Sequence, residues 1–286
     1  TTSGRLSSSG KMNMQQIPRD NPIVKGCMRA AKGKKIVAMD LTTAEVYVAA
    51  VLAKDENLMD VFRQGGNFHS TIAKLVFNLP CEAEDVAEHY STQRQAAKAV
   101  TFGIMYGAGA NKISQQVTAD SGKNFSKGDA QEVIDDYFRQ FHKLKKWIDH
   151  SSKYIMDNGF IYSQYGRKRR LPNVRSDNQG IQSHEVRSGL NFLVQSVASD
   201  INLLGAIDTH NHIKSINKTK EMRIFALVHD SILAEVDEGY VDQYMEIVQK
   251  CIQKDRGIYI PGCPVGCDFD VGEDYSFGKF EKMYDI

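Results

Sequence analysis

Four residues spaced four apart, Arg94, Lys98, Phe102 and Tyr106, form the pattern in this sequence with the clearest chemical meaning. Residues four apart share one face of an α-helix. No Asp or Glu occurs between residues 89 and 119, so two cations one turn apart would repel each other unless a polyanion lay across them. An aromatic ring one turn further along offers a flat surface for a base. The face therefore predicts a nucleotide-binding helix. An ordinary basic surface, with both rings in the core, is the alternative on periodicity alone.

Two carboxylates stand at the ends of apolar segments. Asp40 ends the apolar residues 35–40, and Asp230 lies between the apolar residues 223–228 and 231–236, which predict a β-hairpin. A carboxylate at the exit of a buried strand is costly unless it is paired or bound to a cation. If the strands are neighbours, both carboxylates face one spot, and two hard anions suit Mg²⁺. The alternative is two unrelated turn residues.

A polar stripe runs along a predicted helix over residues 183–213. Arg187, Asn191 and Gln195 repeat every four residues on an otherwise apolar segment. Long hydrogen-bonding side chains suit the minor-groove acceptors that all base pairs share, so the stripe could hold a duplex without reading its sequence. The alternative is the solvated face of the helix.

The elements that must position these residues follow from periodicity. We predict a strand at 35–40, a helix ending near residue 53, and helical structure from 57 to about 162, including one long amphipathic helix over 129–156. Strands and turns follow at 160–174, and a helix over 240–254 and a strand near 264–271 close the chain. Residues 1–34 are loop-like, and a Ser/Gly-rich terminus is usually a flexible tail. The pattern predicts an α+β fold with antiparallel strands, interrupted by a helical subdomain.

Composition narrows the classes of protein. The formal net charge of +1 gives no general affinity for nucleic acid, so such binding needs local patches, and residues 143–146 and 167–170 are basic. Five scattered cysteines, without a second close pair or a nearby histidine, argue against zinc and favour reduced thiols in the cytoplasm. No unbroken apolar run approaches a membrane span. The polar start without Met suggests a fragment or a processed product.

Together, these motifs resemble the polymerase domain of the DNA polymerase I family (family A), particularly its phage members. Residues 1–8 and 13–18 are similar to the family's entry segment, 40–45 to its motif A, 94–107 to motif B, and 228–230 to motif C. Residues 165–169 and the stripe of residues 187, 191 and 195 also occur in family order. The resemblance implies an α+β right-hand polymerase without a thumb, in which an antiparallel palm sheet with flanking helices carries inserted all-helical fingers. The implied domains are 1–45 (palm, first part), 46–176 (fingers) and 177–286 (palm, second part).

The resemblance implies a template-directed DNA polymerase core that adds dNTPs to a primer by two-metal-ion chemistry and releases pyrophosphate. Its implied metal ligands are Asp40, Asp230 and the backbone carbonyl of Leu41, holding two Mg²⁺ ions, for which Mn²⁺ can substitute. Lys98 would join the two carboxylates as a catalytic residue by protonating the pyrophosphate.

The resemblance also assigns binding residues. The implied nucleotide-binding residues are Arg94, Lys98, Phe102, Tyr106, Glu45 and His69. The implied DNA-binding residues are Arg5, Asn13, Gln15, Arg167, Arg187, Asn191, Gln195 and His229. Gly103 would let the template pack closely. The implied partners are primer–template DNA, dNTPs and possible replication accessory proteins, with no membrane. The implied location is the cytoplasm, that of the host cell if the protein comes from a phage.

The sequence departs from the family pattern at two positions. Ser231 stands where the family usually has Glu in motif C, so a third carboxylate is lost unless another residue, such as Glu235, supplies it. Leu41 stands where an aromatic residue is usual. A single-subunit phage-type RNA polymerase is the nearest alternative and commonly has His-Asp-Ser, but Glu45 would exclude a 2′-hydroxyl. A catalytically silent DNA-binding fragment is the other alternative.

Overall fold

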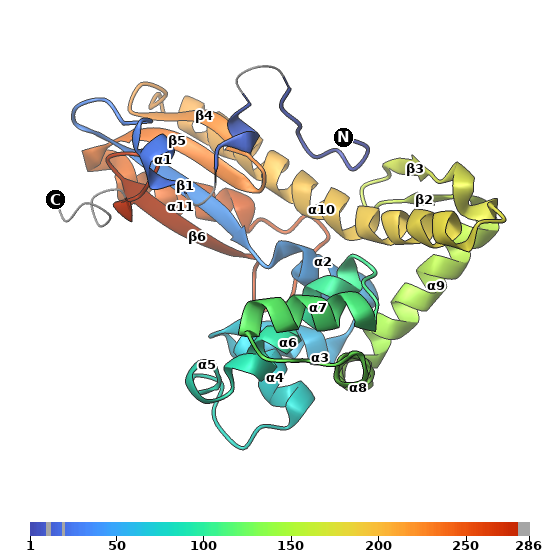
Figure 1. The fold of residues 1–286 in the computed structure, drawn as a ribbon. Helices are drawn as coiled ribbons and strands as arrows, with labels where there is room; N and C mark the ends of the chain where they lie inside the picture. Colours follow the sequence, from blue (N-terminus) through green and yellow to red (C-terminus); the bar gives the residue numbers. More distant parts are fainter. Residues whose placement is uncertain (10–12, 19–20, 280–286) are drawn as a thin grey trace. The chain divides into compact units, whose positions relative to one another are not determined.

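The computed structural model describes residues 1–9, 13–18 and 21–279, which form an α+β fold (Figure 1). The chain divides into two compact units. Unit 1 comprises residues 1–44, 198–257 and 264–286, and unit 2 comprises residues 45–197 and 258–263. The predicted fold class is confirmed.

Unit 1 is built on a four-stranded antiparallel sheet in the order β4-β5-β1-β6 (Figure 1). Its strands are β1 (Lys34–Thr42), β4 (Met222–Val228), β5 (Ser231–Asp237) and β6 (Gly266–Gly272). Its helices are η1 (Met14–Gln16), α1 (Pro22–Gly26), η3 (Glu238–Tyr240), α11 (Val241–Ile252) and the second part of α10 (Gln179–Ser215). The predicted hairpin is present, with His229 and Asp230 between β4 and β5.

The two faces of this sheet differ because side chains alternate along each strand. One face carries the buried side chains Val37 and Met39 of β1 and Ile232 and Ala234 of β5, and α11 packs against β1, β5 and β6. Asp40 is exposed and belongs to the alternate set of β1. Both faces of β1 are buried from Ile36 to Met39, and Asp40 is the first exposed residue after this buried stretch.

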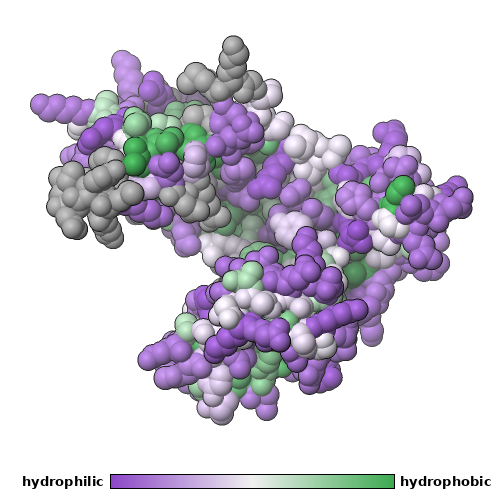
Figure 2. All heavy atoms as spheres, in the orientation of Figure 1, coloured by the Kyte–Doolittle hydropathy of each residue, from purple (hydrophilic) through white to green (hydrophobic). Residues whose placement is uncertain are grey.

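Unit 2 is mainly helical. Its elements are α2 (Ala44–Ala53), α3 (Glu56–Gln64), α4 (Phe68–Phe77), α5 (Val86–His89), α6 (Ser91–Met105), α7 (Ala110–Ser121), α8 (Lys127–Gln140), α9 (His142–Asn158), β2 (Phe160–Tyr162), β3 (Lys168–Arg170), η2 (Pro172–Arg175) and the first part of α10. The visible face of α7 is mainly hydrophilic (Figure 2), and α8 is seen end-on in the same orientation (Figure 1). Their buried residues, such as Ile113 and Val133, form the apolar faces that periodicity predicts.

The predicted single helix over 129–156 is wrong, because α8 ends at Gln140 and α9 begins at His142. Phe141 between them has φ −113° and ψ 59°, and its fully buried ring lies 4.8 Å from that of Tyr137. The buried Asp55 carboxylate accepts the Leu144 N–H at 2.8 Å, which satisfies one of the free donors at the start of α9. The apolar periodicity continues through the break, so the pattern alone could not reveal it.

Helix α10 is 37 residues long, and Gly189 is one of the points where it packs closely against its neighbours. A Cβ at Gly189 would lie 2.7 Å from side-chain atoms of both Ile155 and Leu171, so glycine lets the backbones approach. Among the described residues, α10 alone is long and apolar enough to cross a membrane by length and composition. Core helices pass the same test, and 61% of its apolar window is buried in the protein, so this evidence is weak. The sequence showed no unbroken run because Ser, Asn and Gln interrupt the apolar residues.

The boundaries of the two observed units lie close to the first predicted domain boundary and far from the second. The first division falls between residues 44 and 45, one residue from the predicted boundary. The second falls between residues 197 and 198, inside α10, and not at 176–177, and residues 258–263 return to unit 2. A boundary within a continuous helix leaves no composition change to read. The assignment of palm and fingers to these units stays a prediction.

Candidate nucleotidyl-transfer site

The two predicted metal carboxylates come from neighbouring strands of unit 1. Strands β1 and β5 are antiparallel, and their register pairs Asp40 with Ser231, the residue that directly follows Asp230. Asp230 lies in the two-residue turn, where His229 has a left-handed φ of 54°. The Ser231 hydroxyl donates a hydrogen bond to Oδ1 of Asp40. The structure therefore brings both carboxylates to the same end of the β1–β5 pair.

Arg5 connects the N-terminal segment to this end of the sheet. Its Nη2 lies 3.1 Å from both carboxylate oxygens of Asp230, and the two side chains are 27% and 44% exposed. Exposed pairs of this kind contribute little to stability, but this one places a cation beside the turn. Two further predicted DNA-binding residues, Asn13 and Gln15, hydrogen-bond to the backbone of Ser8. In the described residues, the N-terminal segment is thus held by specific hydrogen bonds and is no simple flexible tail.

A metal site at this end of the sheet would have two side-chain ligands, the carboxylates of Asp40 and Asp230. No group of three or more His, Cys, Asp or Glu residues that could hold a metal ion occurs within the part of the chain that the structure describes. Mg²⁺ keeps several waters and commonly binds one or two carboxylates plus phosphate oxygens. The hard oxygen donors of Asp40 and Asp230 fit that coordination, so the residues present suit the predicted ion.

The cationic face predicted on α6 lies beside α4 in unit 2. Arg94 donates from Nε to the Ser70 hydroxyl at 3.2 Å and from Nη2 to Oδ1 of Asn67 at 3.4 Å. Asn67 also caps α4 by accepting the Ser70 N–H. Lys98 is exposed one turn further along α6. The α4 N-terminus, which favours anions, thus adjoins a guanidinium, and both favour bound phosphate.

His69 joins this cationic cluster from α4. Burial, then Lys98 and then Arg94, lower its pKa to about 4, so the imidazole is neutral at pH 7. Its ring centroid lies 5.3 Å from that of Phe102, and its buried Nδ1 has no hydrogen-bond partner among the described residues. Four predicted nucleotide-binding residues, on α4 and α6, therefore share one region of unit 2.

The lowered pKa of His69 predicts a pH dependence of stability. Between about pH 6.5 and pH 4 the unfolded chain binds a proton on this residue that the folded chain does not, so stability falls as the pH falls through this window. We expect His69→Gln to make the free energy of unfolding depend less steeply on pH over this range. Urea unfolding at stepped pH measures it. Parallel pH profiles for the variant and the parent protein would contradict the assignment.

The remaining residues of this face lie at the C-terminal end of α6. The Tyr106 hydroxyl donates to Oε2 of Glu45 at 2.5 Å, joining two predicted nucleotide-site residues. Gly107 has φ 65°, and a Cβ there would lie 2.3 Å from the Arg187 side chain on α10. Gly103 packs against Ile113 of α7, where a Cβ would lie 3.1 Å away. Gly103 thus has a role in helix packing, which no local sequence pattern indicated.

The predicted DNA-contacting stripe is half-buried on the first part of α10. Arg187, Asn191 and Gln195 are all partly exposed, and the buried Oδ1 of Asn191 has no hydrogen-bond partner within the part of the chain that the structure describes. Arg167, in the loop before β3, donates from Nε to the Ser196 hydroxyl of α10 at 3.3 Å. The β2–β3 hairpin and the stripe are therefore neighbours within unit 2.

The structure brings the predicted residues together in two groups, one in each unit. Unit 1 holds Asp40, Leu41, Asp230, His229, Arg5, Asn13 and Gln15, and unit 2 holds Glu45, His69, Arg94, Lys98, Phe102, Tyr106, Arg167, Arg187, Asn191 and Gln195. Sequence reasoning missed Asn67 and Ser70, which hold Arg94. The available signal was Asn67, a residue type that commonly caps a helix N-terminus, three residues before Ser70 at the predicted start of a helix.

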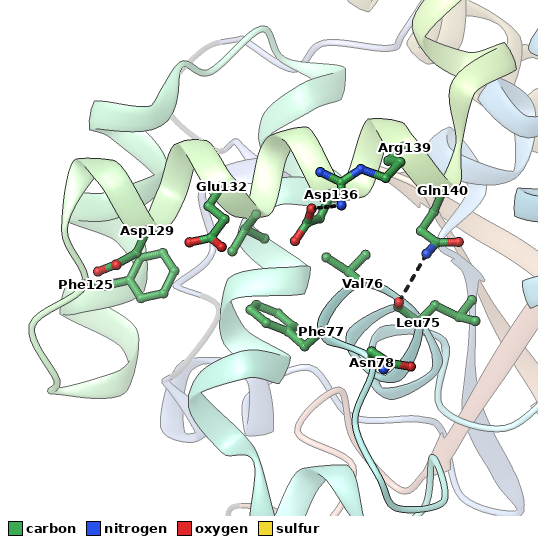
Figure 3. Close-up of a pocket in the computed structure, with 11 residues that line it drawn as sticks. Leu75, Val76, Phe77, Asn78, Phe125, Asp129, Glu132, Asp136, Arg139 and Gln140 are labelled. Atoms are coloured by element: carbon green, nitrogen blue, oxygen red, sulfur yellow. Dashed lines mark hydrogen bonds and ion pairs between the residues drawn. The ribbon is translucent and has the colours of Figure 1, made fainter.

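A cavity of about 550 Å³ lies elsewhere in unit 2, between the C-terminal end of α4 and α8 (Figure 3). Apolar side chains such as Phe77 and Phe125 line it together with Asp129, Glu132 and the Asp136–Arg139 ion pair. It contains no predicted site residue. The nucleotide-site residues are instead exposed or half-buried, as expected where a large charged ligand binds.

The sheet with its carboxylate pair and the helical unit with its cationic face have the fold of a nucleic-acid polymerase. The family model for DNA polymerase family A matches residues 1–276, and the chain belongs to this family. The DNA polymerase of Escherichia phage T5 is 50% identical over 305 aligned positions, covering 99% of this chain and 36% of that protein. The thermostable DNA polymerase I of Thermus aquaticus is 28% identical over 282 positions, covering 98% and 32%.

A solved structure shares this fold. The POL domain of Pol1 from M. smegmatis, in complex with DNA primer-template and dNTP, matches with a TM-score of 0.83 and 25% identity, covering 97% of this chain and 47% of that one. The chain spans about a third of the length of the two curated relatives above. The family and the fold are thus shown for nearly the whole chain.

Proposed function

We propose that this chain is the catalytic core of a template-directed DNA polymerase, which adds dNTPs to a primer 3′ end and releases pyrophosphate. The β1–β5 register carries the proposal, because it places Asp40 opposite the residue that follows Asp230. Membership of family A supports the same reaction.

Asp40 and Asp230 would hold two Mg²⁺ ions, with the Leu41 carbonyl as a further ligand. When bound, the ions would lower the pKa of the primer hydroxyl and balance charge on the departing pyrophosphate. Family A polymerases use divalent metals in general; the choice of Mg²⁺, with Mn²⁺ as a substitute, is part of the proposal.

The chain's own side chains would bind and orient the nucleotide. Arg94 and Lys98 hold the triphosphate, Phe102 stacks on the base and sugar, and the neutral His69 offers a ring nitrogen for a hydrogen bond. The primer 3′-hydroxyl gives up its proton to water, its oxygen bonds to the α-phosphorus, and the bond from that phosphorus to the pyrophosphate oxygen breaks. Lys98 Nζ donates its proton to that leaving oxygen.

The remaining predicted residues would act on the sugar and on DNA. Glu45 excludes the ribose 2′-hydroxyl, and Tyr106 occupies the template-base position before nucleotide binding. Primer–template contacts belong to Arg5, Asn13, Gln15, Arg167, Arg187, Asn191, Gln195 and His229. Accessory proteins, the absence of membrane contact and a cytoplasmic location stay predictions.

A comparison of sugars tests this proposal against RNA synthesis, which the His229-Asp230-Ser231 motif alone would also permit. With Mg²⁺ and a primer–template, we expect dNTPs to be incorporated at least tenfold more efficiently than rNTPs, because Glu45 opposes the 2′-hydroxyl. Steady-state kcat/KM for each nucleotide measures this ratio. Equal or greater use of rNTPs would contradict the assignment, and chelation of the metal should stop extension in every case.

A further inference from the structure

Ser231 makes the one side-chain hydrogen bond to Asp40 that the described residues show, donating from its hydroxyl to Oδ1. We infer that Ser231 is a positioning residue that fixes the orientation of the Asp40 carboxylate for metal binding. This inference rests on the proposed function and assigns a role to the position at which the sequence departs from its family's usual Glu.

Strand register brings the two side chains together. Asp40 and Ser231 are directly opposed in the antiparallel β1–β5 pair, so their Cβ atoms project from the same face, about 5 Å apart. A serine hydroxyl is short and can donate across this spacing without moving either backbone. One oxygen of Asp40 is then engaged, and its Oδ2 keeps its lone pairs for a cation.

The surroundings of Asp40 explain why it needs such a partner. Asp40 is exposed, so packing does not fix its rotamer. On the other side of β1, Asp268 of β6 is directly opposed to Asp40, and like charges in this position repel. The Ser231 hydroxyl on β5 attracts the Asp40 carboxylate, and the Asp268 carboxylate on β6 repels it. Both effects favour the Asp40 rotamer that is directed to Ser231.

Ser231 acts through Asp40 in this arrangement, because its hydroxyl is already committed as a donor to that carboxylate. Hydrogen-bond partners that orient metal ligands typically change metal affinity by about 10- to 100-fold when removed. We place Ser231 at the lower end of this range because the Asp40 carboxylate is exposed to solvent.

The test compares Ser231→Ala with the conservative Ser231→Thr in the purified protein. Mn²⁺ binding is followed by electron paramagnetic resonance, and Asp40→Asn defines the binding that does not depend on Asp40. We expect Ser231→Ala to weaken the Asp40-dependent binding by about tenfold and Ser231→Thr to retain it within about twofold. Ser215→Ala, which removes a hydroxyl bonded to the His212 carbonyl on α10, is the matched control and should bind as the parent does.

Primer extension at stepped Mg²⁺ concentrations provides the kinetic readout. Ser231→Ala should raise the Mg²⁺ concentration for half-maximal rate with little change in the KM for dNTP, and thermal melting checks that the variant is folded. Unchanged Mn²⁺ binding in Ser231→Ala, or an equal loss in Ser231→Thr, would overturn the positioning role. Absence of extension by the parent protein would instead overturn the proposed function, so the two failures are distinguishable.

Discussion

Asp230→Ala should abolish primer extension, lowering the rate by at least about a thousandfold, because a metal ligand supplies several kcal/mol of transition-state charge stabilisation. DNA binding should change far less. Asp230 also accepts a hydrogen bond from Arg5 at 3.1 Å. Removing the Asp230 carboxylate therefore releases the Arg5 guanidinium, which can still contact phosphate. Single-turnover extension and equilibrium binding of a labelled primer–template measure the two effects separately.

A carboxylate at the far end of β5 supplies the control. Asp237 of β5 pairs with Lys34 at 2.5 Å, and Asp237→Asn removes a negative charge at the other end of β5 from Asp230. We expect this variant to extend primers within about twofold of the parent rate, since exposed ion pairs contribute little. Surviving extension in Asp230→Ala, or equal losses in both variants, would refute the two-carboxylate site.

Lys98→Ala should lower kcat by about 10²- to 10⁴-fold, the usual contribution of a positioned proton donor. Lys98 is exposed on α6 one turn from Arg94, which is itself held by Ser70 and Asn67. Loss of one of two phosphate-binding cations should raise the KM for dNTP as well. The split between kcat and KM therefore separates proton donation from binding, and rapid-quench kinetics measures both.

Lys112→Ala is the matched control for charge. Lys112 is an exposed lysine of α7 in the same acid-free segment of the sequence, but it lies outside the α6 face. Its removal should leave kcat within about twofold. If Lys98→Ala changed only KM, the proton-donor role would be wrong while phosphate binding by Lys98 would stand.

The strands and their carboxylates could be predicted because they depend on local patterns. The apolar segments at 35–40 and 223–236 match β1, β4 and β5 closely, and the turn at His229 and Asp230 follows from the polar pair between them. The continuous apolar run of residues 36–39 also placed Asp40 at the end of the buried part of β1. The cationic face of α6 followed from spacing alone, because Arg94, Lys98 and Phe102 all belong to one helix, which ends one residue before Tyr106.

What the sequence could not show depends on contacts between distant segments. The bonds from Arg5 to Asp230 and from Ser231 to Asp40 join residues 225 and 191 positions apart. The break at Phe141 is hidden because its buried ring keeps the apolar period across two helices. The neutrality of His69 depends on burial between α4 and α6, which no local pattern encodes.

Single-nucleotide incorporation by the parent protein tests the central claim most directly. Each of the four dNTPs is offered with Mg²⁺ to four primer–templates that differ only in the templating base. We predict that extension by one nucleotide occurs efficiently only for the complementary dNTP in each case. Addition that ignores the templating base, or none with any dNTP, would contradict the account of a template-directed DNA polymerase.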